Sequence, residues 1–167
     1  DPNLNIPLEM LLLNIQEWNM YDVVVIGSGP GGYVAAIRSA QLGMRTAIIE
    51  KYSTMGGTCL NVGCIPSKAL LDSSHHYEEA IKKFPEHGIN VDGEIKFDLS
   101  KMIGRKQAVV DQTTKGIDFL MKKNKIDVYN GLGSFKDSNN VDLIIDGKVS
   151  KTINSKNIII ATGSKPS

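Results

Sequence analysis

The fold is decided by residues 21–50, which read YDVVVIGSGPGGYVAAIRSAQLGMRTAIIE. The run of four β-branched residues at 23–26 is typical of a strand that is buried on both faces of a parallel sheet. Glycines interrupt this run at 27–32, and a stretch compatible with a helix follows at 33–42. Residues 46–49 form a second apolar run that ends at Glu50. The segment therefore predicts a βαβ unit, and the chain an α/β fold.

The glycines at the first turn match the pattern G-x-G-x-x-G with Gly27, Gly29 and Gly32. In this pattern the first glycine permits a tight turn, the second lets a pyrophosphate approach the backbone, and the third lets the helix pack closely on the strand. The positive end of the helix dipole would face the same phosphates. Glu50 lies 18 residues after Gly32, where a carboxylate that accepts a hydrogen bond from a ribose hydroxyl is expected. We predict binding of a dinucleotide without a 2′-phosphate, rather than a merely structural turn.

Both cysteines lie in residues 56–68, which read GGTCLNVGCIPSK. On a regular helix, the five-residue spacing of Cys59 and Cys64 separates their Cα atoms by about 7.5 Å, beyond the roughly 4.4–6.8 Å of a disulfide. A bond between them needs a distorted turn, which Gly63 and Pro66 favour. A helix that starts near Thr58 would lower the pKa of a cysteine in its first turn. The spacing leaves two interpretations open: a labile redox disulfide, or two buried and inert thiols.

Size and composition exclude several classes of protein. The chain has 167 residues, a mass of 18.2 kDa and a formal net charge of +1, which suits one globular domain and gives no excess charge for nucleic acid or an anionic membrane. Two cysteines are too few for a disulfide framework and poor candidates for a zinc site. Residues 1–20 contain no Lys or Arg, and the apolar cluster at 8–15 is too short to cross a bilayer, so we expect a leader or tag-like extension without a targeting signal. The domain is expected to occupy residues 21–167.

The rest of the chain predicts packing elements. His75 and His76 are adjacent on an expected helix and diverge, so we read them as solvated and expect no metal site. Residues 99–123 predict a long amphipathic helix. Turns are expected at 131–134, 138–140 and 146–147, the last as a hairpin, and a buried strand at 157–160. The candidate core residues of the long helix are Met102, Ile103, Val109, Val110, Ile117, Leu120 and Met121.

These motifs, in this order, resemble the flavin-dependent pyridine nucleotide-disulfide oxidoreductases from about residue 21 to residue 167. Residues 56–71 are similar to the dihydrolipoamide dehydrogenase branch of that family. Glutathione and mercuric reductases share the GGTC part, and a nucleotide-binding module without a redox role is a further alternative. The resemblance implies a Rossmann-like FAD-binding domain, a parallel sheet with helices plus a small antiparallel β-meander, which is truncated in this chain.

The resemblance also implies roles for individual residues. Cys59 would be the thiol that exchanges with the dihydrolipoyl substrate, and Cys64 the thiol beside the flavin. Lys68 would lie near the isoalloxazine ring, where a cation favours reduced flavin, and Glu50 would bind the adenosine ribose. The other implied FAD-binding residues are Gly27, Gly29, Pro30, Gly31, Gly32, Lys51, Gly57, Thr58, Gly133, Ala161, Thr162, Gly163 and Ser164.

Partners and location follow from the resemblance alone. It implies electron transfer to NAD, lipoyl groups of 2-oxo acid dehydrogenase or glycine cleavage complexes as substrates, and a homodimer, with no nucleic acid or membrane partner. The location would be the cytoplasm of a bacterium or the mitochondrial matrix of a eukaryote. The family's NAD-binding and dimerisation domains, with the His-Glu pair that serves as base, have no counterpart in these 167 residues. We therefore expect the chain alone to be inactive and its FAD site to be incomplete.

Overall fold

The computed structural model describes residues 20–164, which form two compact units. The sheet unit comprises the described residues of 1–53 and 120–167, and the helical unit comprises residues 54–119. The predicted extension at 1–20 lies outside the described residues except for its last position. Among the described residues, no helix is long and apolar enough to span a membrane.

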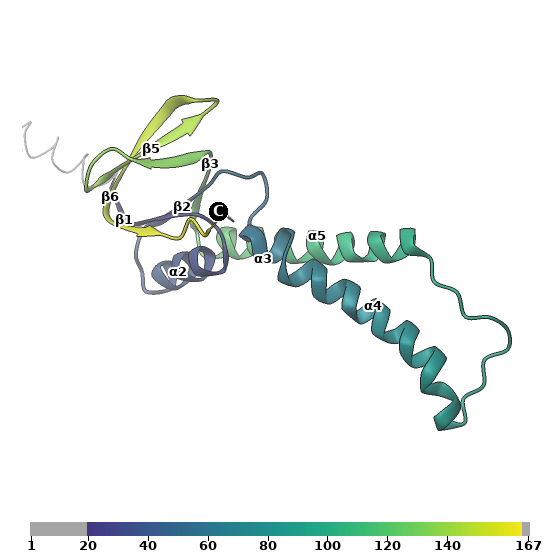
Figure 1. The fold of residues 1–167 in the computed structure, drawn as a ribbon. Helices are drawn as coiled ribbons and strands as arrows, with labels where there is room; N and C mark the ends of the chain where they lie inside the picture. The colour runs from purple at the N-terminus through teal and green to yellow at the C-terminus, as the bar shows by residue number, and fades with distance from the viewer. Residues whose placement is uncertain (1–19, 165–167) are drawn as a thin grey trace, which may run out of the picture. The chain divides into compact units, whose positions relative to one another are not determined.

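The sheet unit contains one sheet of six strands in the order β3-β2-β1-β6-β5-β4 (Figure 1). β1 pairs in parallel with β2 and β6, and β2 pairs in parallel with β3. β4, β5 and β6 form an antiparallel meander. The predicted βαβ unit and α/β fold are confirmed. The elements are β1 (Tyr21–Ile26), α2 (Pro30–Gln41), β2 (Thr46–Glu50), β3 (Asp127–Asn130), β4 (Leu132–Phe135), β5 (Asn140–Ile145) and β6 (Lys148–Ile160).

The core of the sheet unit lies on both faces of β1 and β2, as their continuous apolar runs require. On one face Val24 and Ile49 pack with Val141, Leu143 and Ile153 of the meander. α2 packs against the same two strands through its buried Gly32 and Ala36, and Figure 1 shows it on the side opposite the meander. Since successive strand side chains point to opposite faces, both faces of β1 are covered.

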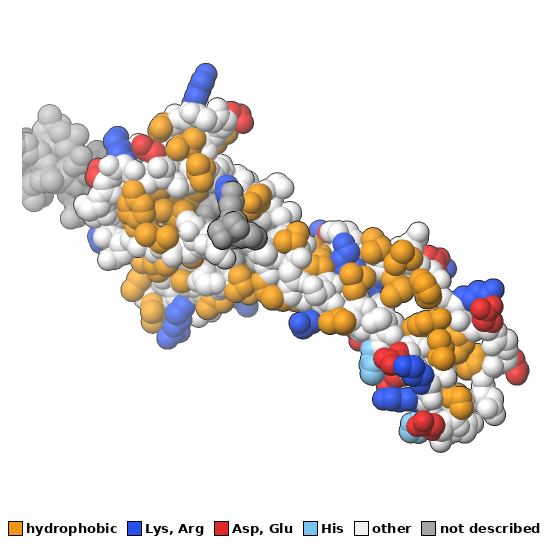
Figure 2. All heavy atoms as spheres, viewed as in Figure 1, with side chains coloured by type: hydrophobic (Ala, Val, Ile, Leu, Met, Phe, Trp, Pro, Cys, Tyr) orange, Lys and Arg blue, Asp and Glu red, His pale blue; other side chains and the backbone are white. Residues whose placement is uncertain are grey.

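The helical unit contains α3 (Gly57–Asn61), α4 (Cys64–Lys82), the 3₁₀ helix η1 (Phe84–His87) and most of α5 (Leu99–Lys123). The bounds of α5 match the predicted helix. Hydrophobic side chains remain exposed on this unit (Figure 2), among them Ile81, Ile89, Val91 and Phe97. The Phe97 ring contacts the Tyr77 ring edge-on at 5.4 Å between centroids.

Three predictions about packing and turns need correction. Of the candidate core residues of α5, Val110, Ile117 and Met121 are buried but Ile103 is 45% exposed, because helical periodicity defines a face without defining how far a neighbour covers it. The turn expected at 131–134 is confined to Gly131, since β4 begins at Leu132. The strand at 157–160 is confirmed, but Ile160 is 65% exposed, because α2 packs mainly on β1 and β2.

The turn expected at 138–140 is found at 138–139, since β5 begins at Asn140, and the hairpin at 146–147 is confirmed. Asp146 and Gly147 both have positive φ, 52° and 74°, as the two central residues of a type I′ turn require. This hairpin joins β5 to β6, and β6 then continues from the meander into the parallel part of the sheet. It thereby brings residues 161–164 to the carboxyl end of β1.

Candidate functional site

The candidate nucleotide site lies where the carboxyl ends of β1 and β6 meet. From β1 the chain proceeds to β2 and β3 on one side, whereas β6 lies on the other, so the strand order reverses between β1 and β6. Ligands of open α/β sheets bind outside the carboxyl ends of the strands at such a switch point. Backbone hydrogen bonds hold this edge, from Gly27 N to the carbonyl of Ile49 and from Ala161 N to the carbonyl of Ile26, both at 2.8 Å.

The structure explains the glycine at each of the three motif positions in a different way. Gly27 has a φ of 99°, and a Cβ there would lie 2.3 Å from the carbonyl oxygen of Ala161. A Cβ at Gly32 would lie 1.8 Å from the carbonyl oxygen of Gly27, so this glycine lets α2 pack on β1. A Cβ at Gly29 would meet nothing within 4 Å. Gly27 and Gly32 are therefore explained by packing within the protein, whereas Gly29 leaves open space where a pyrophosphate is predicted.

The N-terminus of α2 suits an anion. Gly29 is the N-cap residue, Pro30 occupies the first turn, and neither a capping side chain nor an acidic residue is present there. The 12-residue helix directs the positive end of its dipole at the turn. A Cβ at Gly31 would also meet nothing within 4 Å. The turn therefore fits the phosphates of a dinucleotide.

Glu50 lies beside the glycine turn and is 5% exposed. Its Oε2 accepts hydrogen bonds from Ser28 N at 2.9 Å and from Ser28 Oγ at 2.6 Å. Its Oε1 accepts from Tyr52 N at 3.0 Å. The fully buried Ser28 thus joins the two halves of the predicted site, and the sequence analysis missed it. A small hydroxyl residue between the first two glycines was the available signal, but nothing in sequence connects it with Glu50.

The other predicted contacts of the sheet unit fall into two groups. Gly133 lies in β4, where a Cβ would meet the side chains of Ile26 at 3.0 Å and Ile49 at 3.4 Å, so packing at the carboxyl ends of β1 and β2 leaves little room for a larger residue. Lys51 is exposed, with its Nζ 4.8 Å from the centroid of the Tyr52 ring. At the end of β6, Ala161 is half-buried, whereas residues 162–164 (Thr162, Gly163 and Ser164) are exposed.

The cysteine segment of the helical unit breaks between its two cysteines. α3 ends at Asn61 and α4 begins at Cys64, and Gly63 between them has φ −114° and ψ −110°, outside the helical region. The Asn61 side chain stabilises the start of α3, because its Nδ2 donates hydrogen bonds to the carbonyl oxygens of Met55 and Gly57 at 3.0 and 2.9 Å. The distortion that a bond between the cysteines requires is therefore present.

The two thiols are free and contact each other. Cys59 is half-buried and Cys64 is exposed, so the alternative of two buried thiols is wrong for Cys64. The side-chain hydrogen bond with Cys64, aided by desolvation, raises the pKa of Cys59. This is opposite to the predicted effect of the helix start, because α3 has only five residues and the direct thiol contact dominates. The charge of Lys68, which is exposed one turn into α4, opposes the increase in this pKa.

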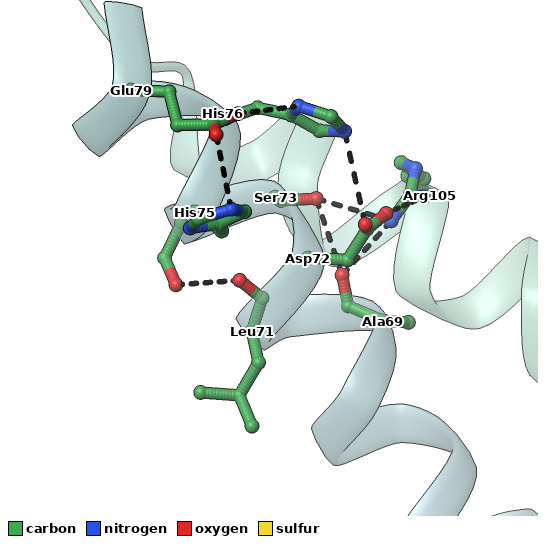
Figure 3. Close-up of polar contacts among 9 residues, drawn as sticks. Ala69, Leu71, Asp72, Ser73, His75, His76, Glu79 and Arg105 are labelled. Carbon is green, nitrogen blue, oxygen red and sulfur yellow. Dashed lines mark hydrogen bonds and ion pairs between the residues drawn. The ribbon is translucent and has the colours of Figure 1, made fainter. Parts of the chain in front are cut away.

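The histidines of α4 lie on its solvent side in a polar network (Figure 3). His75 and His76 are 57% and 72% exposed and pair with carboxylates of the same helix, which confirms that they are solvated. Arg105 of α5 donates to Asp72 Oδ2 at 2.5 Å and to the carbonyl oxygen of Ala69 at 2.9 Å. Within residues 20–164 there is no group of three or more His, Cys, Asp or Glu side chains that could hold a metal ion.

Comparison with known proteins shows which family and which relatives the chain resembles. Residues 21–167 match the family model of the pyridine nucleotide-disulphide oxidoreductases. The chain is 50% identical over 150 residues to dihydrolipoyl dehydrogenase of Trypanosoma brucei brucei, covering 89% of this chain and 31% of the relative. It is 53% identical over 146 residues to the mitochondrial dihydrolipoyl dehydrogenase of Schizosaccharomyces pombe, covering 87% and 28%. The dihydrolipoyl dehydrogenase of Acholeplasma laidlawii is 49% identical over 144 residues, covering 86% and 41%.

The chain thus aligns with less than half the length of each of these relatives. The matched region contains the glycine turn, Glu50, the cysteine pair and the strand that ends at Ile160. The α/β fold, with its mostly parallel six-stranded sheet, agrees with this family. The chain belongs to the pyridine nucleotide-disulphide oxidoreductase family.

Proposed function

We propose that the chain is the FAD-binding, disulfide-bearing part of a dihydrolipoyl dehydrogenase, which oxidises dihydrolipoyl groups with NAD as the electron acceptor. The observation that carries the proposal is the break between α3 and α4, which places Cys59 and Cys64 on the two sides of a non-helical turn where their side chains interact. The names of the relatives favour this activity over another disulfide reductase or a module without redox chemistry.

FAD is the proposed cofactor, and when bound it supplies an acceptor for the two electrons of the dithiol. The open space at Gly29 and the uncapped start of α2 support a pyrophosphate there. Glu50 would accept a hydrogen bond from the adenosine ribose. Lys51, Gly133 and residues 161–164 would complete the nucleotide side of the site. By resemblance to the family, Gly57, Thr58, Cys64 and Lys68 of the helical unit would also bind FAD.

The cysteine pair would perform thiol-disulfide exchange. One thiolate of the dihydrolipoyl group attacks Cys59 Sγ of the oxidised pair, the Cys59–Cys64 bond breaks, and Cys64 leaves as a thiolate. The second substrate thiolate attacks the substrate sulfur of the mixed disulfide and releases Cys59. The substrate leaves as a cyclic disulfide, one of its two protons passes to Cys59 and the other is released, and both electrons remain on the two cysteines.

Proton transfer in this exchange needs a base. Hydrogen bonding to Cys64 raises the pKa of Cys59, so the Cys59 thiol keeps its proton near neutral pH once the pair is reduced. A base must therefore remove this proton when the pair is oxidised again. In the proposed enzyme the His-Glu pair of a partner subunit in a homodimer would serve as this base.

The relatives also suggest where the enzyme works. The Schizosaccharomyces pombe relative is named as mitochondrial, which supports the mitochondrial matrix as the proposed location in a eukaryote. In a bacterium the proposed location is the cytoplasm. The substrates in either case would be lipoyl groups carried by 2-oxo acid dehydrogenase or glycine cleavage complexes.

The proposal is tested by counting thiols in the full-length protein that contains this chain. The oxidised protein is treated anaerobically with dihydrolipoamide, quenched with an alkylating agent and mapped by mass spectrometry. We expect Cys59 and Cys64 to be linked before treatment and both alkylated afterwards. In a Cys64→Ser variant treated instead with oxidised lipoamide, the Cys59 thiolate should open the lipoamide disulfide and form a mixed disulfide at Cys59. Two cysteines that are alkylated equally with and without dihydrolipoamide would overturn the proposal.

A further inference from the structure

We infer that Ser28 is a positioning residue for Glu50, holding its carboxylate in the orientation that selects a ligand with an adenosine ribose hydroxyl. The inference rests on the proposed function and deepens it. It starts from a contact that joins two segments 22 residues apart, the glycine turn after β1 and the end of β2.

The contact is buried on both sides. Ser28 is fully buried and Glu50 is 5% exposed. A buried carboxylate is stable only when hydrogen-bond donors replace the water it has lost. Ser28 supplies two donors to one oxygen, Oε2, at 2.6 Å from its hydroxyl and 2.9 Å from its backbone N–H. Bonds from two atoms of one residue fix both the position of this oxygen and the plane of the carboxylate.

The second oxygen, Oε1, has fewer donors than Oε2. Oε1 accepts from Tyr52 N at 3.0 Å. A carboxylate has about four acceptor positions, so the three donors found within residues 20–164 leave about one position, on Oε1. One ligand hydroxyl can therefore bind Glu50 without displacing a protein donor. Because Ser28 fixes the carboxylate beforehand, the ligand need not order it on binding.

The test uses the full-length apoprotein with Ser28→Ala, Glu50→Gln and the double variant. Two probes are titrated, FAD and an FAD analogue whose adenosine ribose lacks both hydroxyls. Ser28→Ala keeps the backbone donor and removes the hydroxyl donor. We expect it to raise the dissociation constant of FAD about tenfold, or about 1.4 kcal/mol, and to leave that of the analogue unchanged. In the Glu50→Gln background the same change should have less than half of this effect, because Ser28 acts through Glu50.

Ser155→Ala is the matched control. Ser155 is also fully buried in the sheet unit and donates from Oγ to the carbonyl oxygen of Asn157 at 2.7 Å, away from Glu50. It should lower the unfolding temperature without discriminating between the two probes. The unfolding temperature of every apoprotein variant is measured alongside, so that loss of folding is recognised as such.

The outcomes are distinct. Equal weakening of FAD and the analogue by Ser28→Ala would show a merely structural serine and overturn the inference. Unchanged FAD binding in a folded Ser28→Ala protein would also overturn it, while leaving the proposed function intact. Failure of the wild-type full-length protein to bind FAD would overturn the proposed function and this role together.

Discussion

Replacing Gly32 by Ala tests the packing of the predicted nucleotide-binding turn. A Cβ at this position would lie 1.8 Å from the carbonyl oxygen of Gly27, whereas real Cβ atoms keep at least 3.0 Å. One of the two segments must therefore move by about 1.2 Å. Gly27 cannot move easily, because backbone hydrogen bonds hold it and its neighbour. Gly27 N donates to the carbonyl oxygen of Ile49, and the carbonyl oxygen of Ile26 accepts from Ala161 N, both at 2.8 Å. α2 must move instead and lose part of its contact with β1.

Two opposing effects determine how much Gly32→Ala lowers the free energy of unfolding. Overpacking of this kind destabilises a protein by about 1–3 kcal/mol, and a clash with backbone belongs at the upper end. Alanine in place of glycine in a helix recovers about 1 kcal/mol. The net loss is about 2 kcal/mol, which lowers the unfolding temperature by about 4–8 °C in a domain of this size.

The matched control is Gly31→Ala, one position earlier in the same helix. A Cβ there would meet nothing within 4 Å. It keeps the helical gain of about 1 kcal/mol without the clash, so the unfolding temperature should rise by about 2–4 °C. Both variants are compared by thermal unfolding of the apoprotein, followed by circular dichroism. Equal unfolding temperatures for the two variants would refute the reasoning that Gly32 is required for packing of α2.

Three further predictions concern single side chains. Arg105→Met removes the contacts with Asp72 and Ala69. Because this ion pair is about half exposed, the free energy of unfolding should fall by at most about 1 kcal/mol, and the unfolding temperature by less than about 4 °C. Lys106→Met is the control, and a decrease of more than about 10 °C for Arg105→Met would contradict the prediction. The hydrogen bond from Lys156 holds the pKa of Asp22 below its ordinary value, so its stabilising effect is complete above that value and is lost as the pH falls through the lowered pKa. Asp22→Asn should therefore flatten the decline of the unfolding temperature below about pH 5, and an unchanged profile would contradict the assignment. In the reduced protein, the pH midpoint for alkylation of Cys59 should lie above the ordinary pKa of a cysteine. Cys64→Ala should lower this midpoint, because it removes the hydrogen bond that raises the pKa of Cys59. A midpoint that Cys64→Ala leaves unchanged would show that another group raises this pKa.

The sequence predicted those features that depend on local pattern. The β-branched run before Gly27 is enough for a buried strand, and a 25-residue periodic stretch is enough for α5. The five-residue spacing of the cysteines indicated only that a bond between them would need a distorted turn, because a regular helix holds such positions too far apart.

The features that sequence could not predict depend on contacts between distant segments. Gly133 belongs to a strand although a glycine favours turns, because β4 pairs with β5 there and the side chains of Ile26 and Ile49 leave little room beside it. Ser28 meets Glu50 only because β1 and β2 pair in parallel. The pKa of Cys59 was predicted with the wrong sign because the contact with Cys64 outweighs the five-residue helix α3.

The most direct test of the proposed redox site is the absorption spectrum of the full-length protein during anaerobic addition of two electrons from dihydrolipoamide. A thiolate of Cys64 beside an oxidised flavin should give a long-wavelength charge-transfer band, which Cys59→Ser should retain and Cys64→Ser should abolish. A flavin that is bleached by dihydrolipoamide without such a band, or a band that survives in Cys64→Ser, would contradict the assignment of Cys64. A full-length protein that holds no flavin would contradict the account as a whole.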